Sequence, residues 1–286
     1  MSYKNIVIYG ASGWLGRITI NYILKNHPEF YLILVTSKEI NLSQIKKNFK
    51  TINFEEFLKL KNEQIDYFLN FSFITQEKLD KFTKNDYIIS TNNIINSYSS
   101  FMENNIVKKS LLTSSGAVYW KGTEKENLYA IQKYKQENYF KKINFDINSN
   151  FLIARIYGVI GSQYDFNKNY AFTNFIKSGI EKKPITITSK KKVLRSYLYF
   201  ENLLDYFFNK EYKQQTLDTW DTILDIHELA EKIAKIFNVK VKINPEYFDS
   251  LTSDEYLSKD DFFKKIYKLD LTEEKLEKII MEKSIF

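Results

Sequence analysis

The sequence predicts an α/β fold, a doubly wound parallel sheet with helices on both faces, followed by a small carboxyl-terminal lobe. Two features predict it. Strand-like and helix-like segments alternate through the first half of the 286-residue chain, and such alternation is typical of a parallel sheet covered on both faces. A loop with Gly10, Gly13 and Gly16 follows the first apolar segment, which is where a doubly wound sheet opens its ligand-binding crevice.

The elements of the first half follow from hydrophobic periodicity. Short apolar runs predict strands, and longer segments with apolar residues three and four positions apart predict helices. The expected strands cover residues 6–9, 31–35, 67–71, 111–113 and 151–156. The expected helices cover residues 14–25, 94–104 and 124–142.

The alternation weakens after residue 156. The expected elements there are a helix at 170–178, a strand at 185–188, a turn of lysines before Arg195, and amphipathic helices at 226–237 and 272–281. No repeat, low-complexity tract or flexible linker separates the two parts. We therefore expect a sheet domain at 1–156 and a small substrate-binding lobe at 157–286, with some segments returning to the sheet.

The composition excludes several classes of chemistry. A hydrophobic content of 44% supplies ample core, and there are no cysteines, which excludes disulfides, thiolate nucleophiles and cysteine-ligated zinc. The histidines are His27 and His227, too few for a histidine metal cluster, and both are expected to be incidental. No metal site is predicted.

The charge pattern argues against a nucleic-acid role. The net charge is +7, but lysines alternate with glutamates on helical faces, as in residues 228–235, which is typical of solvated surface. No signal-peptide core and no apolar run of membrane-spanning length are present. We expect a cytoplasmic protein with no nucleic-acid or membrane partner.

The glycine loop predicts a dinucleotide site. In Gly10-Ala-Ser-Gly-Trp-Leu-Gly16, the glycine spacing allows a tight turn, close approach of the backbone to a pyrophosphate, and close packing of the helix that begins near Trp14. The fold is therefore expected to be Rossmann-type, with 1–156 as the dinucleotide-binding domain. The expected contacts in this loop are Gly10, Ser12, Gly13, Trp14, Leu15 and Gly16.

The end of the second strand favours NADP(H) over NAD(H), which stays possible. An NAD-binding domain usually places a carboxylate there to hold the ribose 2′-hydroxyl, but this chain has Thr36, Ser37 and Lys38, and the first carboxylate after the strand is Glu39. Arg17 directly after the third glycine, with Ser37 and Lys38, would suit a 2′-phosphate.

Tyr129 and Lys133 predict proton-transfer chemistry. Positions four residues apart share one face of a helix, so the phenol and the ammonium can point to one place. We expect the lysine charge to favour phenolate and to lower the pKa of the tyrosine by roughly one to three units, which would make it a proton donor and acceptor near neutral pH.

With these residues assembled, the chain resembles the extended short-chain dehydrogenase/reductase family, in particular its NAD-dependent epimerase/dehydratase branch acting on nucleotide sugars. The resemblance extends over nearly the whole chain. Besides the glycine loop and the Tyr129 to Lys133 segment, it rests on Leu112-Thr-Ser-Ser-Gly-Ala-Val-Tyr119, Ala154-Arg-Ile-Tyr-Gly-Val-Ile-Gly161 and Leu194-Arg-Ser-Tyr-Leu-Tyr-Phe-Glu-Asn202.

The resemblance implies roles at matched positions. Ser115, four residues before Tyr119, would hydrogen-bond the reacting oxygen of the substrate. Tyr129 would exchange the proton, and Lys133 would bind the nicotinamide ribose. Arg195 matches a segment whose arginine contacts the diphosphate of a nucleotide sugar.

Two further expectations follow from the resemblance. Residues 71–73 align with the loop that lines the cofactor, so Phe71 and Ser72 are expected cofactor contacts. Family members commonly dimerise through two helices, one of which bears the residue matched by Tyr129, so a homodimer is expected. Arg155 is instead expected to close a buried hydrogen-bond network at a strand end.

Some positions depart from the family pattern. Gly116 and Ala117 stand where dehydratases carry an Asp-Glu pair, which disfavours a 4,6-dehydratase. Gly158 replaces an asparagine that many epimerases use against the substrate diphosphate, and Ser196 replaces the usual aspartate after the arginine. Only 13 residues separate Ser115 from Tyr129, fewer than in typical UDP-glucose 4-epimerases.

Three functions fit these residues. The leading hypothesis is an NADPH-dependent reductase of a keto group, at C4, on a nucleotide-activated deoxysugar, with Tyr129 as proton donor. The alternative is an NAD-dependent nucleotide-sugar 4-epimerase. The third is a non-catalytic NADP-binding sensor, although such proteins generally lose the tyrosine and the lysine.

Overall fold

The computed structural model describes residues 3–38, 40, 48–164, 166, 170–249, 252–268 and 271–282. The chain forms two compact units. Unit 1 is built from Met1–Arg155 and Leu204–Leu217, and unit 2 from Ile156–Leu203 and Asp218–Ser284. The chain thus leaves unit 1 once, returns to it, and leaves it again.

Unit 1 alternates strands and helices. Its strands are β1 (Lys4–Tyr9), β2 (Phe30–Val35), β3 (Phe49–Ile52), β4 (Gln64–Asn70), β5 (Ile106–Ser115) and β6 (Asn150–Ile156). Its helices are α1 (Trp14–Asn26), α2 (Phe54–Lys59), η1 (Gln76–Lys81), α3 (Lys84–Glu103), η2 (Gly116–Trp120) and α4 (Leu128–Asp146). β6 ends in the first residue of unit 2, and two further elements cross between the units, α6 (Phe200–Asn209) and β10 (Gln214–Thr219).

The central sheet is seven-stranded, in the order β10-β6-β5-β4-β1-β2-β3. The pairs β1–β2, β1–β4, β2–β3 and β4–β5 are parallel. Because β1 lies between β2 and β4, the strand order reverses at β1. The glycine loop that follows β1 therefore lies at the topological switch point, where α/β sheets bind their ligands.

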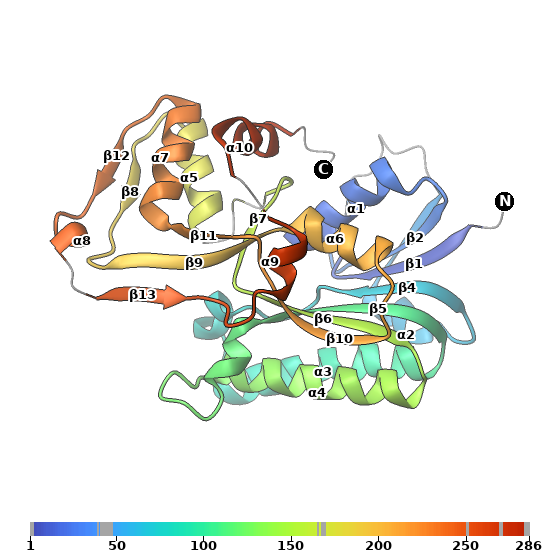
Figure 1. Ribbon diagram of the computed structural model, residues 1–286. Coiled ribbons are helices and arrows are strands. Elements are labelled where there is room, and N and C mark those ends of the chain that lie inside the picture. Colours follow the sequence, from blue (N-terminus) through green and yellow to red (C-terminus); the bar gives the residue numbers. More distant parts are fainter. Residues whose placement is uncertain are drawn as a thin grey trace. The chain divides into compact units, whose positions relative to one another are not determined.

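Helices cover both faces of this sheet, as the sequence predicts. α1 lies on the face opposite to α3 and α4, which lie side by side (Figure 1). Buried aromatic rings join the second face to the sheet. The ring centroid of Phe101 on α3 lies 4.7 Å from that of Phe57 on α2 and 5.1 Å from that of Phe68 on β4.

Unit 2 contains smaller sheets and helices. Its strands are β7 (Gly158–Ile160), β8 (Ile185–Ile187), β9 (Lys192–Tyr199), β11 (Thr222–Asp225), β12 (Val241–Ile243) and β13 (Ser253–Tyr256). Its helices are α5 (Ala171–Ile180), α7 (Ile226–Phe237), α8 (Glu246–Asp249), α9 (Phe262–Ile266) and α10 (Glu273–Ile280). β9 pairs with β7, β11 and β13, and β8 pairs with β12.

Local signals explain where element bounds differ from the prediction. α4 begins at Leu128 and not at residue 124, because the Asn127 side chain caps it by accepting a hydrogen bond from the main-chain N–H of Ala130. α3 begins ten residues before the predicted 94–104 helix, after its cap Thr83. The lysine turn is present, and β9 follows it directly from Lys192.

Among the described residues, no helix combines the length and the apolar character that a membrane crossing needs.

Candidate active site

The glycine loop is fixed by main-chain contacts on both sides. The N–H groups of Gly10 and Ala11 both donate to the carbonyl of Val35, at 3.1 Å. Gly10 has φ of +93°, and a Cβ there would lie 3.0 Å from the main-chain nitrogen of Ser72. Any residue other than glycine would therefore be strained in conformation and crowded against the end of β4.

The same loop packs tightly against the start of α1. A Cβ on Gly16 would lie 2.5 Å from the carbonyl oxygen of Gly10, closer than real atoms approach. Gly13 is the N-cap residue, no side chain caps α1, and its first turn carries no acidic residue. A helix N-terminus of this kind favours an anion, so the loop fits the pyrophosphate of a dinucleotide.

The residues expected to choose between NAD and NADP are described only in part. The hydroxyl of Thr36 accepts from the Lys38 N–H at 3.0 Å and donates to the Lys38 carbonyl at 2.8 Å, forming a tight turn after β2. Ser37 and Lys38 are exposed, and Arg17 on α1 is half-buried. Glu39 lies outside the described residues, and the 2′-phosphate site stays a prediction.

The structure brings two of the predicted catalytic residues into contact. Ser115 ends β5, and Tyr129 lies in the first turn of α4. The Ser115 side chain lies close enough to the Tyr129 phenol to oppose the rise in its pKa. The Ser115 hydroxyl also accepts the N–H of Ala117 at 3.2 Å, which orients it at the end of the strand.

Lys133 lies one turn further along α4 and is buried. Its Nζ donates to the Thr113 carbonyl at 3.1 Å and to Oε1 of Gln136 at 3.0 Å. The ring centroid of Phe73 lies 4.0 Å from the same nitrogen. The described contacts of the lysine are therefore to β5, to its own helix and to the loop after β4.

The expected lowering of the Tyr129 pKa is wrong in direction, because burial and not the charge of Lys133 sets the shift. Burial raises the pKa of Tyr129 to about 12, the hydrogen bond from Ser115 opposes this, and the charge of Glu77 adds to it. Burial also lowers the pKa of Lys133 to about 7, against the attraction of Glu137. The cost of burying a charged group dominates at both residues, so Tyr129 keeps its proton at neutral pH.

Arg155 closes a hydrogen-bond network at the end of β6, as predicted, but the network is buried at Glu137 and open to solvent at Tyr119. Its Nε and one terminal nitrogen donate to the two carboxylate oxygens of Glu137 at 2.9 and 2.7 Å, and the other terminal nitrogen donates to the Tyr119 hydroxyl at 2.8 Å. The pair joins the end of β6 to α4, directly beyond Lys133. Glu137 was not found from the sequence, because acidic residues on helices are usually exposed.

Arg195, the expected diphosphate contact, lies in unit 2 on β9. Its guanidinium donates to the Asp254 carboxylate and to the Asp254 carbonyl, both at 2.7 Å. Asp254 lies on β13, beside β9. The guanidinium charge is thus partly neutralised by a neighbour that the sequence did not identify.

The structure of unit 2 explains why position 158 carries glycine where many epimerases carry asparagine. Gly158 pairs with Tyr197 across β7 and β9. A Cβ on Gly158 would lie 2.8 Å from the Tyr197 ring. The buried ring of Tyr197 therefore occupies the space that a side chain at position 158 would need. Ser196 is also buried, and its hydroxyl accepts the N–H of Ser258 at 3.0 Å.

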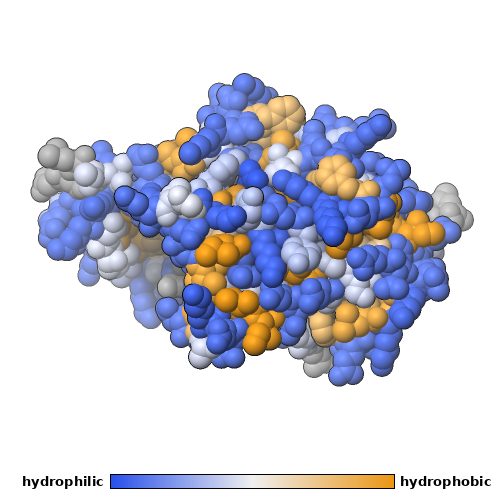
Figure 2. Space-filling model, turned by 90° about the horizontal axis from the view of Figure 1, so that it is seen from below, coloured by the Kyte–Doolittle hydropathy of each residue, from blue (hydrophilic) through white to orange (hydrophobic). Residues whose placement is uncertain are grey.

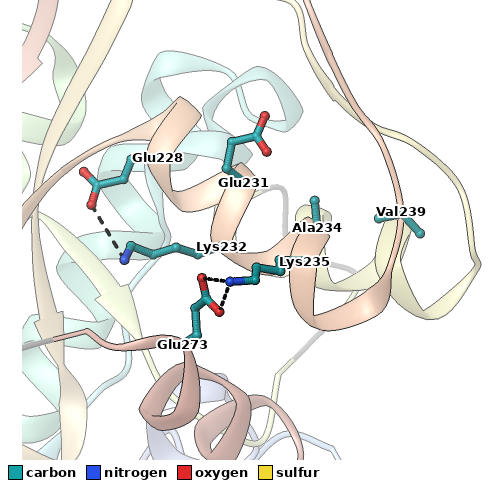
Figure 3. A pocket seen from close by; sticks show the side chains of 7 residues that line it. All are labelled: Glu228, Glu231, Lys232, Ala234, Lys235, Val239 and Glu273. Carbon is teal, nitrogen blue, oxygen red and sulfur yellow. Dashed lines mark hydrogen bonds and ion pairs between the residues drawn. The ribbon is translucent and has the colours of Figure 1, made fainter.

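A groove elsewhere in unit 2 is a poor candidate for a site. It lies between α7 and α10, has a volume of about 400 Å³, and is lined largely by charged residues (Figure 3). Lys235 pairs with Glu273 at 2.6 Å and Lys232 with Glu228 at 3.9 Å. None of the residues predicted for binding or catalysis lines this groove.

Comparison with known proteins identifies the family of the chain. The model of the NAD dependent epimerase/dehydratase family matches residues 6–208. No curated protein sequence matches the chain.

Solved structures of nucleotide-sugar epimerases share the fold. The UDP-N-acetylglucosamine 4-epimerase of Methanobrevibacter ruminantium, in complex with UDP-N-acetylmuramic acid, is 18% identical, with a TM-score of 0.74 over 98% of each chain. The UDP-glucuronic acid 4-epimerase of Bacillus cereus, in complex with UDP-glucuronic acid and NAD, is 15% identical, with a TM-score of 0.72 over 96% of this chain and 98% of that chain.

A third structure extends the comparison. The UDP-glucose 4-epimerase of Thermus thermophilus, in complex with NAD, is 14% identical, with a TM-score of 0.69 over 96% of this chain and 97% of that chain. At these identities the structures establish the fold, and the family model establishes the family. The chain belongs to the NAD-dependent epimerase/dehydratase family and is an enzyme of the extended short-chain dehydrogenase/reductase type.

Proposed function

We propose that this enzyme is an NAD-dependent 4-epimerase of a nucleotide-diphosphate sugar. The observation that carries the proposal is the grouping of Ser115, at the end of β5, with Tyr129 and Lys133 on α4, at the sheet edge that also carries the glycine loop. The 4-epimerase structures of the same fold support this reaction over the reductase that the sequence favours.

The residues have complementary roles in this proposal. When bound, the dinucleotide supplies the hydride acceptor and donor for the sugar carbon. In its phenolate form, which burial disfavours, Tyr129 would take the proton from the C4 hydroxyl as the hydride leaves C4, and the phenol would return that proton when the hydride comes back. Ser115 would hold the same oxygen. Lys133 binds the ribose next to the nicotinamide, and the loop from Gly10 to Gly16 holds the pyrophosphate.

We assign the dinucleotide to unit 1 and the diphosphate of the nucleotide sugar to unit 2. Arg195 is the proposed diphosphate contact, since a guanidinium offers a planar fork to phosphate oxygens. Asp254 would then compete with the substrate for this guanidinium. Replacement of Asp254 by asparagine should lower the KM for the nucleotide sugar and leave dinucleotide affinity unchanged.

Reduction of a keto sugar with NADPH is the second candidate. Two observations favour it. Residues 36–38 carry no carboxylate, and Tyr129, with its pKa raised to about 12, is a proton donor at neutral pH, which is the form a reductase uses. The two candidates differ in what happens to the cofactor, because an epimerase regenerates it in each cycle whereas a reductase consumes it.

Incubation with NAD and a panel of UDP-sugars distinguishes the candidates. The epimerase predicts interconversion of C4 epimers, followed by NMR, with no net change in NADH and with cofactor that stays bound through purification. Net oxidation of added NADPH with a 4-keto sugar, without epimer formation, would contradict the epimerase and support the reductase.

We also propose a homodimer that forms through α3 and α4. Figure 2 shows unit 1 from the side on which these helices lie, and hydrophobic groups are visible there among hydrophilic ones. Large side chains are exposed on both helices, with Ile89 on α3 at 56%, and Tyr139 and Phe145 on α4 at 44% and 58%. Such residues favour a protein contact.

Analytical ultracentrifugation tests the dimer. Replacement of Tyr139 by glutamate should convert the dimer to a monomer, because it places a charge within the proposed contact. Ile223, in unit 2, is exposed to a similar extent, 40%, and its replacement by lysine is the matched control. A Tyr139→Glu variant that sediments like the unmodified protein would contradict this contact.

A further inference from the structure

Three groups surround the ammonium of Lys133. Two of its hydrogens are donated to Thr113 and Gln136, at 3.1 and 3.0 Å. The third group is the ring of Phe73, with its centroid 4.0 Å from Nζ. A ring face at this distance attracts an ammonium electrostatically, most strongly where water is excluded, and Lys133 is only 4% exposed.

The same ring also contacts the proposed proton-transfer residue. The ring centroids of Phe73 and Tyr129 lie 6.1 Å apart with the planes at 71°, an edge-to-face arrangement. Phe73 therefore contacts both members of the tyrosine–lysine pair, and it reaches them from the loop after β4.

The backbone of this loop is held on both sides of Phe73. The N–H of Phe71 donates to the Tyr9 carbonyl at 2.9 Å, and the N–H of Ser72 donates to Oδ1 of Asn70 at 3.1 Å. On the other side, the Tyr87 hydroxyl donates to the Ile74 carbonyl at 2.9 Å. Phe73 itself is half-exposed, so its ring can leave by rotation about its own side-chain bonds while the backbone stays in place.

We infer that Phe73 is a positioning residue that covers Lys133 and that its ring must swing aside before a dinucleotide ribose can bind the ammonium. The inference rests on the proposed function, in which Lys133 binds that ribose. The glycine loop needs no such change, because its phosphate site is formed by main-chain groups. Phe73 and the nicotinamide ribose therefore compete for one ammonium, whereas Phe73 and the pyrophosphate do not compete.

Dinucleotide affinity tests the competition. Replacement of Phe73 by alanine should tighten NAD(H) binding by about three- to thirtyfold, the range that corresponds to loss of a competing cation–π contact. ADP has the diphosphate but lacks the nicotinamide ribose, so its affinity should stay within twofold. If Phe73 only packed against its neighbours, its replacement would weaken NAD(H) binding or leave it unchanged, whereas the competition predicts tighter binding.

Chemical labelling of Lys133 tests whether Phe73 shields its amine, and it needs no cofactor. The rate of reductive methylation at Lys133, measured by mass spectrometry of the peptide, should rise at least fivefold in Phe73→Ala. Phe73→Leu keeps bulk over the amine and should label at nearly the original rate. Phe82→Ala is the matched control, because Phe82 is also half-exposed near η1 but packs on Tyr87, and it should change neither labelling nor affinity.

The two experiments show separately whether the inference about Phe73 fails and whether the proposed function fails. Unchanged labelling in Phe73→Ala, or NAD(H) binding no tighter than that of the unmodified protein, would overturn the inference about Phe73. An equal gain in affinity for ADP and NAD(H) would also overturn it, since the effect would then lie at the phosphates. If no variant binds a dinucleotide, the proposed function fails, and labelling alone decides whether Phe73 covers Lys133.

Discussion

At the scale of single residues, burial shifts Tyr129 and Lys133 in opposite directions. Both groups are less stable in their charged form where water is excluded, so the pKa of the phenol rises to about 12 and that of the ammonium falls to about 7. Coulomb attraction between ammonium and phenolate was the basis of the sequence prediction, and it assumed solvated groups. Spacing along a helix predicts which side chains share a face, but it does not predict how deeply they are buried.

The shifted pKa of Lys133 predicts a pH-dependent stability. The folded pKa is about 7, below the value of about 10.4 expected for an unfolded chain. Between these values the unfolded state binds more protons, so the free energy of unfolding should rise with pH over that window.

A lysine-to-methionine variant isolates this contribution. The Lys133→Met variant lacks the charge, so its stability advantage over the unmodified protein should be largest below pH 7 and should shrink as the pH rises toward 10. Urea unfolding at several pH values provides the measurement. A difference between the two proteins that does not change with pH would contradict the shift.

At the scale of elements, α4 has a buried face that is polar. Lys133, Gln136, Glu137 and Asn144 are all buried on this helix, and the Asn144 side chain accepts a hydrogen bond from the Ser110 hydroxyl on β5 at 2.6 Å. Tyr129 and Lys133, the proposed proton-transfer residues, therefore stand on a helix that is attached to the sheet by hydrogen bonds as well as by apolar packing.

Removal of the Glu137 carboxylate should destabilise the whole protein. Glu137→Ala leaves the Arg155 guanidinium, which is 17% exposed, without its ionic partner, and the loss of one member of a buried pair costs about 3–5 kcal/mol. Lys108→Ala is the control, because the Lys108 side chain is 62% exposed in its pair with Asp66, and such pairs contribute roughly 0–1 kcal/mol. Equal losses of unfolding free energy in the two variants, measured by denaturant unfolding, would contradict this prediction, because the buried pair would then contribute no more than the exposed one.

The glycine loop gives a second prediction at this scale. Gly16→Ala forces a methyl group against the carbonyl of Gly10, at 2.5 Å, so we expect at least tenfold weaker dinucleotide binding and a lower melting temperature. Gly122→Ala is the control, since Gly122 also has positive φ, +76°, but has no neighbouring atom within 4 Å of the added Cβ. Its dinucleotide affinity should not change, and a Gly16→Ala variant with unchanged affinity would contradict the packing argument.

At the scale of the whole molecule, the sequence predicts unit 1 better than unit 2. β2, and β1 from Ile6 onward, are continuous apolar runs, which periodicity detects. β3 has one buried residue among four, and β9 carries Arg195 and Ser196 in its middle, so neither has the pattern of a buried strand. Strands of this kind are defined by their pairing with neighbours distant in sequence, which one sequence does not reveal.

In the candidate site, too, some features could be predicted from the sequence and others could not. The places of Ser115 at a strand end and of Tyr129 and Lys133 on one helix could be predicted from the sequence, whereas their catalytic roles stay a prediction. The partners Glu137 and Asp254, and the ring of Phe73 over Lys133, were not predicted. These contacts depend on how the chain folds and on which side chains become buried. Neither burial of a polar side chain nor a contact between distant segments leaves a pattern in a single sequence.

The turnover of a Tyr129→Phe variant tests the central claim most directly. Tyr134, which is 37% exposed on the same helix, provides the matched Tyr134→Phe control. With a substrate from the nucleotide-sugar panel, Tyr129→Phe should lose roughly 10²–10⁴ in kcat, while its dinucleotide affinity stays within twofold and Tyr134→Phe keeps full activity. A Tyr129→Phe variant that turns over at the original rate would contradict proton transfer by Tyr129.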